Sequence, residues 1–219
     1  MTIQNISDCE ICLHVFPGRI PARARCAIGF LVLTTLWSLT IRCDLFHTRD
    51  PQSPSQSRSG FLPPTSPDIV LENLKNSVSE RNTDNYIKCF SDTAFSTRRF
   101  AFLPTQEAQT KYIGVFRDWD LNSERDYFEN LRSRTPTDAS SSLFLTGGFQ
   151  SILSDSALYY ADYLLNFQHN AAGIPQQAKG HLQFFLAPDR NQYWSVYRWI
   201  DAKVGNDLSW SELKGFFSN

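Results

Sequence analysis

The spacing of the apolar residues changes near Ser140, and this change constrains the fold more than any other feature. Before it, apolar residues recur every three or four positions, the period of a helix. After it they alternate, the period of a strand. Short turn-forming clusters separate the alternating stretches, so the expected strands are 141–153, 156–169, 177–187 and 192–204. Consecutive strands with short loops form an antiparallel meander, and helices followed by strands predict the α+β class.

Two short helices are expected to open the folded part of the chain as a hairpin. The first begins at Pro67, a residue suited to the first turn of a helix, and runs to about Arg81. Asn82 suits the left-handed position that ends a helix. Thr83 or Asp84 then caps the second helix.

Further elements lie on either side of the strands. Residues 95–103 are expected to form a strand or an extended arm, a helical region is expected to start at Thr105, and a second piece of it at Asn122 or Ser123. A short terminal helix is expected at Ser209, where Ser-Trp-Ser-Glu has the spacing of a capping box. One face of the region after Thr105 is formed by Tyr112, Val115, Phe116 and Trp119.

An uncharged apolar run occupies residues 26–41, and three arginines precede it between residues 19 and 25. A positive stretch followed by an apolar one is the layout of a signal peptide. As a helix the run would rise about 24 Å, which is short for a permanent span of a hydrocarbon core about 30 Å thick. We predict that residues 1–42 are a signal peptide or a membrane anchor.

Cys43 follows the run directly, and a cysteine at this place resembles the lipidation site of a bacterial lipoprotein signal. That pattern has Leu and then two small residues before the cysteine, whereas Thr40, Ile41 and Arg42 stand there in this chain. The alternative is an uncleaved anchor with its N-terminus in the cytoplasm. Either arrangement attaches the protein to the membrane of the cell envelope and places residues 44–219 in the periplasm or outside the cell, because basic residues favour the cytoplasmic side.

Residues 43–66 are rich in proline and serine and carry too few apolar side chains to fold. We interpret them as a spacer between the membrane and a domain at 67–219. The chain has 21 Lys and Arg against 22 Asp and Glu, so it lacks the basic excess of a nucleic-acid-binding protein. The sequence has no phosphate-binding glycine loop and no cluster with metal-ligand spacing, so no cofactor and no metal are expected.

Two parts of the sequence resemble the NTF2-like (SnoaL-like) superfamily. Residues 67–74 (PDIVLENL) and 80–86 (ERNTDNY) look like its opening helical hairpin, and residues 193–201 (YWSVYRWID) look like its terminal strand with the pattern W-x-I-x-x-W-x-D. The resemblance covers about residues 66–204. It implies a cone in which N-terminal helices pack on a curved antiparallel sheet and enclose a pocket.

The direction of each side chain on the sheet decides which residues would line that pocket. On the third strand the apolar set should face the interior, which leaves His181 on the convex face. On the second strand, Asp162 faces outward if the odd-numbered residues line the cone, and a slip of one residue would reverse this. The ligand-binding residues expected are Tyr86, Tyr112, Trp119, Leu182 and Phe184.

An enzyme of this fold would need a general acid or base inside the cone. The weak candidates are Tyr86, Asp118, Tyr160, Asp162 and His169, and no two of them have a spacing that forces them together. We therefore expect a membrane-tethered, non-catalytic domain that binds a small apolar ligand or an envelope protein. The alternative is a SnoaL-like isomerase, cyclase or dehydratase acting by acid–base catalysis, and a scaffold subunit or a homodimer through the sheet also remains open.

Overall fold

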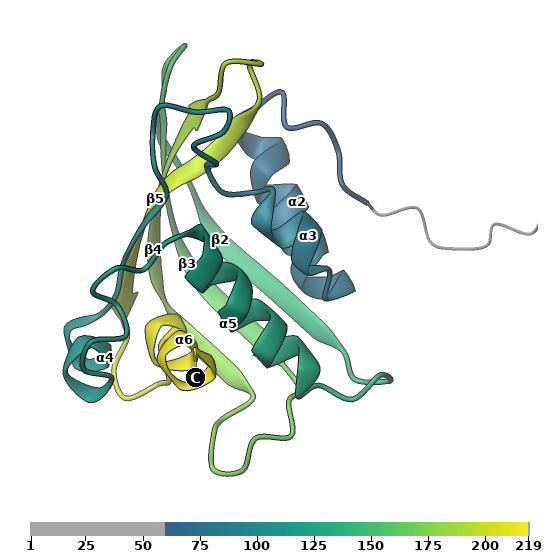
Figure 1. Cartoon of the computed structure of the whole chain (residues 1–219), viewed down its shortest axis with the longest axis vertical. Coiled ribbons are helices and arrows are strands. Elements are labelled where there is room, and N and C mark those ends of the chain that lie inside the picture. Colours follow the sequence, from purple (N-terminus) through teal and green to yellow (C-terminus); the bar gives the residue numbers. More distant parts are fainter. Residues whose placement is uncertain (1–59, 219) are drawn as a thin grey trace, which may run out of the picture. The chain divides into compact units, whose positions relative to one another are not determined.

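The computed structural model describes residues 60–218 (Figure 1). The apolar run 26–41, Cys43 and the spacer up to residue 59 lie outside the described residues. The helices are α2 (Pro67–Glu80), α3 (Thr83–Ile87), α4 (Gln106–Lys111), α5 (Leu121–Ser133) and α6 (Trp210–Phe217), and the strands are β1 (Ala101–Leu103), β2 (Ser141–Ile152), β3 (Ala157–Phe167), β4 (Gln177–Pro188) and β5 (Trp194–Lys203). Helices followed by a sheet give the predicted α+β class.

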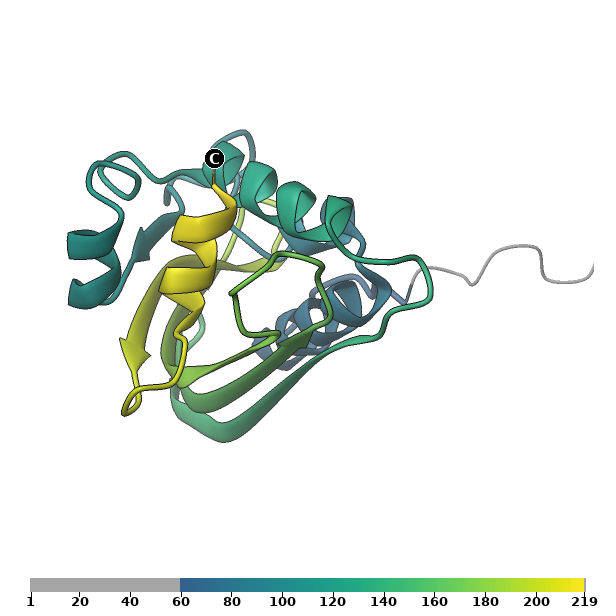
Figure 2. The same ribbon diagram turned by 90° about the horizontal axis from the view of Figure 1, so that it is seen from below.

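The five strands form one sheet in the order β1-β5-β4-β3-β2. Strands β2 to β5 are the predicted antiparallel meander, while β1 pairs with β5 in parallel, with Phe102 opposite Trp199. The strands curve beneath the helices, and α5 and α6 lie on the concave side of the sheet (Figure 2). This curved sheet covered by helices is the predicted cone.

The two faces of the sheet differ as the alternation predicts. The odd-numbered residues of β3 are buried, from Ala157 to Phe167, and on β4 Leu182 and Phe184 are buried as well. Asp162 and Tyr160 on β3 point to the opposite, convex face and are exposed. The apolar lining of the cone therefore comes from one parity of each strand.

The pairing of β2 with β3 is irregular just beyond a pair of glycines, Gly147 and Gly148. The register between β2 and β3 shifts between Phe149 and Ser151, two residues beyond the pair. Gly147 allows the neighbouring strand to approach closely, since a Cβ atom there would lie 2.2 Å from the carbonyl oxygen of Tyr160 on that strand. The close approach of β3 requires glycine at this position.

The boundary of the helical hairpin differs by one residue from the prediction. Arg81, not Asn82, takes the left-handed conformation, with φ of 53°, and ends α2. Asn82 is extended and its side chain accepts a hydrogen bond from the backbone N–H of Asn85, so it caps α3. The predicted caps Thr83 and Asp84 are wrong because Asn82 already fills that role.

The helix predicted from Thr105 is much shorter than expected. Thr105 is its N-cap, but α4 ends at Lys111 and turns follow. Gly114 has φ of +87°, a conformation that interrupts a helix, so Tyr112 and Trp119 do not share one helical face. Helix α5 begins one residue earlier than predicted because the Asp120 carboxylate accepts hydrogen bonds from the next turn's N–H groups.

Residues 60–66 pack along α2 before the first helix begins. The Asn73 side chain on α2 exchanges two hydrogen bonds with the backbone of Leu62, and the Pro64 carbonyl accepts one from the backbone of Trp194 at the start of β5. Within residues 60–218, no helix has both the length and the apolar composition needed to cross a membrane.

Candidate functional site

The centre of the cone holds an ion pair between two helices. Nζ of Lys214 on α6 lies 2.6 Å from Oε2 of Glu124 on α5, and both side chains are 0% exposed. Two charges buried this completely require partners that satisfy the rest of their hydrogen-bonding groups. The side chains around the pair supply them.

Glu124 accepts hydrogen bonds from two further groups. The Tyr86 hydroxyl on α3 donates to Oε1 at 2.6 Å, and the Trp119 indole N–H donates to Oε2 at 2.8 Å. Burial and the neighbouring carboxylate raise the pKa of Tyr86 well above its usual value, so its hydroxyl keeps its proton and acts as a donor. The carboxylate is therefore held between three donors.

Aromatic rings surround the ammonium group of Lys214. Nζ lies 3.5 Å from the ring centroid of Trp199 on β5 and 3.6 Å from that of Phe102 on β1. Ring faces attract a cation, and the attraction increases when water is absent. Burial lowers the pKa of Lys214 to about 8, although the Glu124 carboxylate opposes the shift, so the ammonium form prevails at neutral pH.

A second buried carboxylate, Asp201 on β5, fixes the start of α6. Its Oδ1 accepts a hydrogen bond from the Tyr163 hydroxyl at 2.9 Å, and its Oδ2 accepts from the backbone N–H of Ser211 at 2.8 Å and from the Ser211 hydroxyl. Burial raises the pKa of Asp201. A buried carboxylate beside a tyrosine is the pair that acid–base catalysis in a cone would use, but both of its oxygens are bonded within the chain.

The sequence of α6 explains why this helix enters the cone. Ser209 and Glu212 form the predicted capping box, and Glu212 also pairs with Lys203 at 2.9 Å. Trp210 then inserts between the sheet and α5, where its indole N–H donates to the Tyr127 hydroxyl. A helix of eight residues is thus anchored at its first turn and packed along its length.

The interior of the cone is consequently filled by the chain's own side chains. Trp199, Trp210 and Tyr127 are fully buried, as are both members of the ion pair. None of these five side chains lines the groove or the smaller pockets described on residues 60–218. The arrangement holds the helices on the sheet and keeps the charged groups out of contact with solvent.

Four of the five residues predicted to line the pocket are buried in this core: Tyr86, Trp119, Leu182 and Phe184. The structure brings Tyr86 and Trp119 together on the Glu124 carboxylate. Tyr112 lies apart from them, against Gly215 of α6, where a Cβ atom would lie 2.3 Å from its ring.

The other residues considered for catalysis are scattered. Asp118 is exposed in a turn, and Tyr160 and Asp162 lie on the convex face of the sheet. His169 is buried in the loop after β3, where its Nε2 lies 3.2 Å from the Pro175 carbonyl oxygen. These residues do not form one site.

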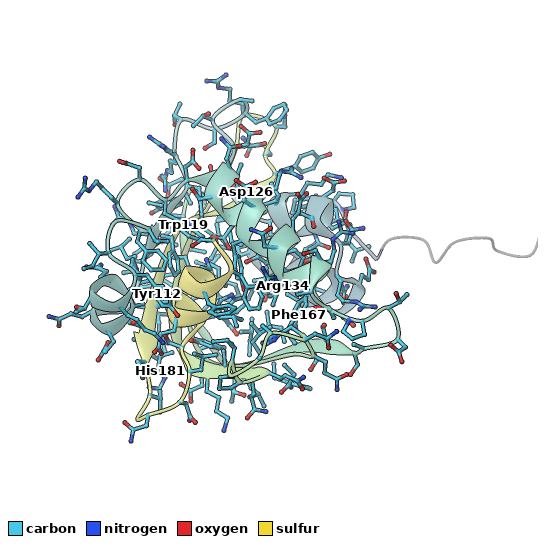
Figure 3. The ribbon with its side chains drawn as sticks, turned by 60° about the horizontal axis from the view of Figure 1, so that its bottom comes forward. Tyr112, Trp119, Asp126, Arg134, Phe167 and His181 are labelled. Atoms are coloured by element: carbon cyan, nitrogen blue, oxygen red, sulfur yellow. The ribbon has the colours of Figure 1, made fainter. Side chains whose placement is uncertain are left out.

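His181 lies on the outer side of the sheet, away from the helices, as predicted (Figure 3). It pairs with Asp162, and its ring stacks on that of Tyr160 at a centroid distance of 5.9 Å. Both members of the pair are partly exposed. Within residues 60–218, no group of three or more histidine, cysteine or acidic side chains could hold a metal ion.

Glu124 and Lys214 are not among the residues predicted from the sequence, although the sequence contains a signal for both. Glu124 stands four residues before Phe128, on the apolar stripe of α5, and Lys214 stands four residues after Trp210 on the stripe of α6. Opposite charges on the buried faces of two amphipathic helices indicate an internal ion pair.

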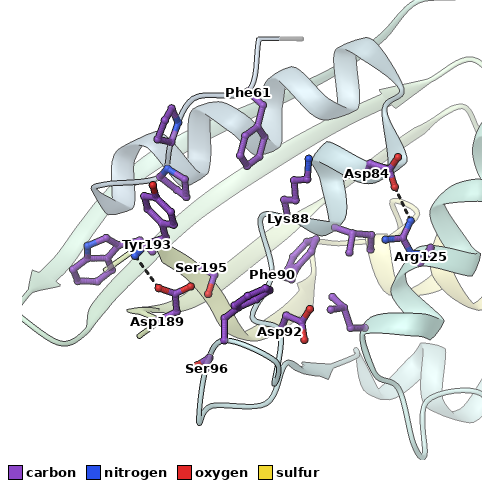
Figure 4. Close-up of a pocket in the computed structure, with 16 residues that line it drawn as sticks. Phe61, Asp84, Lys88, Phe90, Asp92, Ser96, Arg125, Asp189, Tyr193 and Ser195 are labelled. Carbon is purple, nitrogen blue, oxygen red and sulfur yellow. Dashed lines mark hydrogen bonds and ion pairs between the residues drawn. The ribbon is translucent and has the colours of Figure 1, made fainter. Parts of the chain in front are cut away.

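A separate groove opens on the surface between residues 60–66, α3 and the start of β5 (Figure 4). Its cavity volume is about 650 Å³. The aromatic and proline residues that line it are Phe61, Pro63, Pro64, Phe90, Phe95, Tyr193 and Trp194.

Charged side chains stand at one end of this groove (Figure 4). Asp84 and Arg125 form an ion pair at 2.9 Å, and Lys88 lies with its Nζ 5.6 Å from the ring centroid of Phe61. Asp189, at the other end, accepts backbone hydrogen bonds from its own turn, including that of Tyr193 at 3.0 Å. Several of the polar groups are therefore occupied, and the free surface of the groove is mostly apolar.

No protein-family model matches the sequence, and no curated protein does either. Among solved structures, the chain is similar to a proposed aromatic ring hydroxylase from Novosphingobium aromaticivorans, with 13% identity over 67% of this chain and 92% of that chain and a TM-score of 0.49. A proposed dehydratase of the NTF2-like family from Streptomyces avermitilis is 9% identical over 63% and 93%, with a TM-score of 0.45. A ketosteroid isomerase-like protein from Erwinia carotovora atroseptica is 9% identical over 63% and 93%, with a TM-score of 0.42.

The described residues form an α+β domain with the NTF2-like fold. We base this assignment on the chain's own architecture, namely a helical hairpin, a short arm, further helices and then a curved antiparallel meander with the helices on its concave face. The particular form seen here is a closed cone, because α6 and its Lys214 occupy the interior.

Proposed function

We propose that this chain is a membrane-tethered, non-catalytic binding module of the cell envelope, in which the surface groove beside α3, and not the interior of the cone, takes a small apolar ligand. One observation carries the proposal. The interior of the cone is filled around the pair of Lys214 and Glu124, so a ligand has to bind elsewhere on the domain.

The size and lining of the groove suit a small molecule. Its volume of about 650 Å³ lies within the range of roughly 300–1,000 Å³ common for ligand sites. Phe95 and Tyr193 at its edge are 53% and 44% exposed. Covering these two rings with an apolar ligand would remove apolar surface from water, at about 25 cal/mol for each Å².

The tether is proposed from the sequence, from the arginines before residue 26 and the apolar run 26–41. The structure adds one supporting feature. Phe61, Pro63 and Pro64, which lie at the end of the predicted spacer, form one wall of the groove. A ligand in the groove would therefore contact the last residues of the tether. Ligand binding would then depend on the position of the tether and on any tension in it.

Binding can be tested with the neutral fluorescent probe N-phenyl-1-naphthylamine and the full-length chain in detergent, with detergent alone as the blank. We expect saturable fluorescence enhancement with one site per chain. Phe95→Ser and Tyr193→Ser should each weaken probe binding by about tenfold, because both side chains are exposed and line the groove. Ile113→Ser is the matched control, since Ile113 is 86% exposed and does not line the groove.

Two results would contradict the groove as the ligand site. One is the absence of saturable binding by the folded chain. The other is equal weakening by Ile113→Ser and by the two groove variants, which would indicate unspecific binding to exposed apolar surface.

The tether is tested separately by mass spectrometry of the protein extracted from membranes. A diacylglycerol adduct on Cys43 establishes a lipoprotein, and an intact N-terminus in the membrane fraction establishes an uncleaved anchor. Recovery of the chain only from the soluble fraction, cleaved before residue 43, contradicts the tether.

A further inference from the structure

We propose that the closed cone contains a binding site for a primary alkylammonium group, built by Glu124 and the rings of Phe102 and Trp199, and that Lys214 is its covalently attached occupant. The site differs from the surface groove, and its existence does not depend on the function proposed for that groove. It concerns which ligand chemistry the interior of this domain accepts.

The first argument is that groups other than Lys214 already hold the Glu124 carboxylate in place. Glu124 is oriented by the Tyr86 hydroxyl at 2.6 Å and by the Trp119 indole N–H at 2.8 Å, and neither donor comes from α6. Both contacts would therefore remain if the Lys214 side chain were shortened. A carboxylate held this way in a dry interior binds a cation with little reorganisation.

The second argument is the pair of ring faces opposite the carboxylate. Phe102 belongs to β1 and Trp199 to β5, and their centroids are 5.1 Å apart with the planes at 79°. The two rings therefore form a corner, and Nζ of Lys214 lies 3.6 and 3.5 Å from their centroids. Aromatic corners with a carboxylate opposite recognise ammonium groups.

The third argument is size. From Cγ to Nζ, a lysine side chain has four non-hydrogen atoms, the same number as n-propylammonium. Shortening Lys214 to alanine would leave a channel of that length, lined by apolar atoms and ending at the carboxylate. Since the fold keeps α6 in place through the capping box and the Asp201 contacts to Ser211, the channel should persist in the variant.

The experiment measures the melting temperature of the full-length Lys214→Ala chain at pH 7 with increasing n-propylammonium chloride. At this pH free n-propylamine is protonated, and the Glu124 carboxylate favours the charged form in the site. We expect a saturable rise in Tm of about 2–4 °C. Sodium chloride at equal ionic strength and the neutral n-propanol should not produce it.

Two further variants separate the alternatives. Lys214→Met fills the same space without charge, so its melting temperature should not respond to the amine. Lys214→Ala combined with Glu124→Gln keeps the channel but removes the negative charge, and the response should be lost.

Each remaining outcome decides the proposal. If Lys214→Ala folds only when n-propylammonium is present, the site is supported. If n-propanol raised the Tm of Lys214→Ala equally, the site would be only an apolar cavity, which contradicts the proposal. If n-propylammonium raised the Tm of the double variant Lys214→Ala, Glu124→Gln equally, the carboxylate would have no role, which also contradicts the proposal. A Lys214→Ala chain that gains no stability from the amine, or that stays unfolded with it while Lys214→Met folds, overturns the proposal.

Discussion

The Lys214 ammonium and the Glu124 carboxylate, ninety residues apart in sequence, meet at 2.6 Å inside the cone and join α6 to α5. The rings of Phe102 and Trp199 surround the cationic side of this fully buried pair. The contact determines both what holds the domain together and why its interior takes no free ligand.

Breaking this pair on one side should be strongly destabilising. Lys214→Met or Glu124→Gln alone is expected to lower the free energy of unfolding by about 3–5 kcal/mol, because the remaining group is left buried without its partner. The double variant should lose less than the sum of the two. Denaturant unfolding of the four chains measures the coupling.

Arg125→Met provides the control for that cycle. Its ion pair with Asp84 also joins α5 to α3, but the two side chains are 39% and 77% exposed. Its loss should change stability by less than about 1 kcal/mol. A Lys214→Met variant as mild as Arg125→Met would contradict the structural role given to the buried pair.

The close approach of β2 and β3 at Gly147 predicts an unequal response of two adjacent glycines. Gly147→Ala should cost about 1–3 kcal/mol of stability, since a Cβ atom would lie 2.2 Å from the Tyr160 carbonyl oxygen and the strands would have to move. Gly148→Ala meets no atom within 4 Å and should be nearly neutral. Equal melting temperatures of the two variants would show that the strands are farther apart than described.

His169 predicts a dependence of stability on pH. Burial lowers the pKa of His169 below its ordinary value of 6.5, so the unfolded chain binds more protons than the folded chain between the two values. Stability should therefore increase as the pH rises towards 6.5 and decrease as the pH falls below it. Urea unfolding between pH 5 and 7 measures the slope.

Two histidine variants show which residue causes this dependence of the unfolding free energy on pH. His169→Phe should reduce it, because Phe cannot bind a proton, whereas His181→Phe on the convex face should leave the His169 contribution in place. A slope that disappears in His181→Phe and persists in His169→Phe would refute the assignment.

The convex face of the sheet is the surface we expect a second copy of the chain to use. Phe144 on β2 is 57% exposed there, and Leu103 on β1 and Tyr160 on β3 are exposed on the same face. Phe144→Asp should reduce the dimer fraction at least tenfold in sedimentation equilibrium, whereas Ile113→Asp should not. A wild-type chain that is monomeric at all concentrations would contradict the expected dimer.

The order of elements and the direction of the strand side chains could be predicted because both depend on local periodicity. The alternation on β3, from Ala157 to Phe167, indicates the buried face directly. Errors arose where one residue's conformation ends an element. Arg81 adopts the left-handed conformation in place of Asn82, and Gly114 interrupts a helix whose apolar spacing appeared continuous.

The site depends on contacts that no local pattern contains. The parallel pairing of β1 with β5 and the insertion of α6 bring residues 102, 124, 199 and 214 together across most of the domain. An open pocket was expected because the resemblance to the NTF2-like superfamily implies one. The charges on the buried faces of α5 and α6 were the sequence signal that the pocket would be closed.

The closure of the cone by α6 is tested most directly by the chemical reactivity of the chain's six lysines. Burial lowers the pKa of Lys214 to about 8, which would increase the reactivity of its amine if reagents could reach it. A short pulse of an acetylating N-hydroxysuccinimide ester on the folded full-length chain, read by peptide mass spectrometry, should modify Lys214 at least tenfold more slowly than the exposed Lys88. Modification of Lys214 as fast as Lys88, or faster, would show that the cone is open and contradict the account.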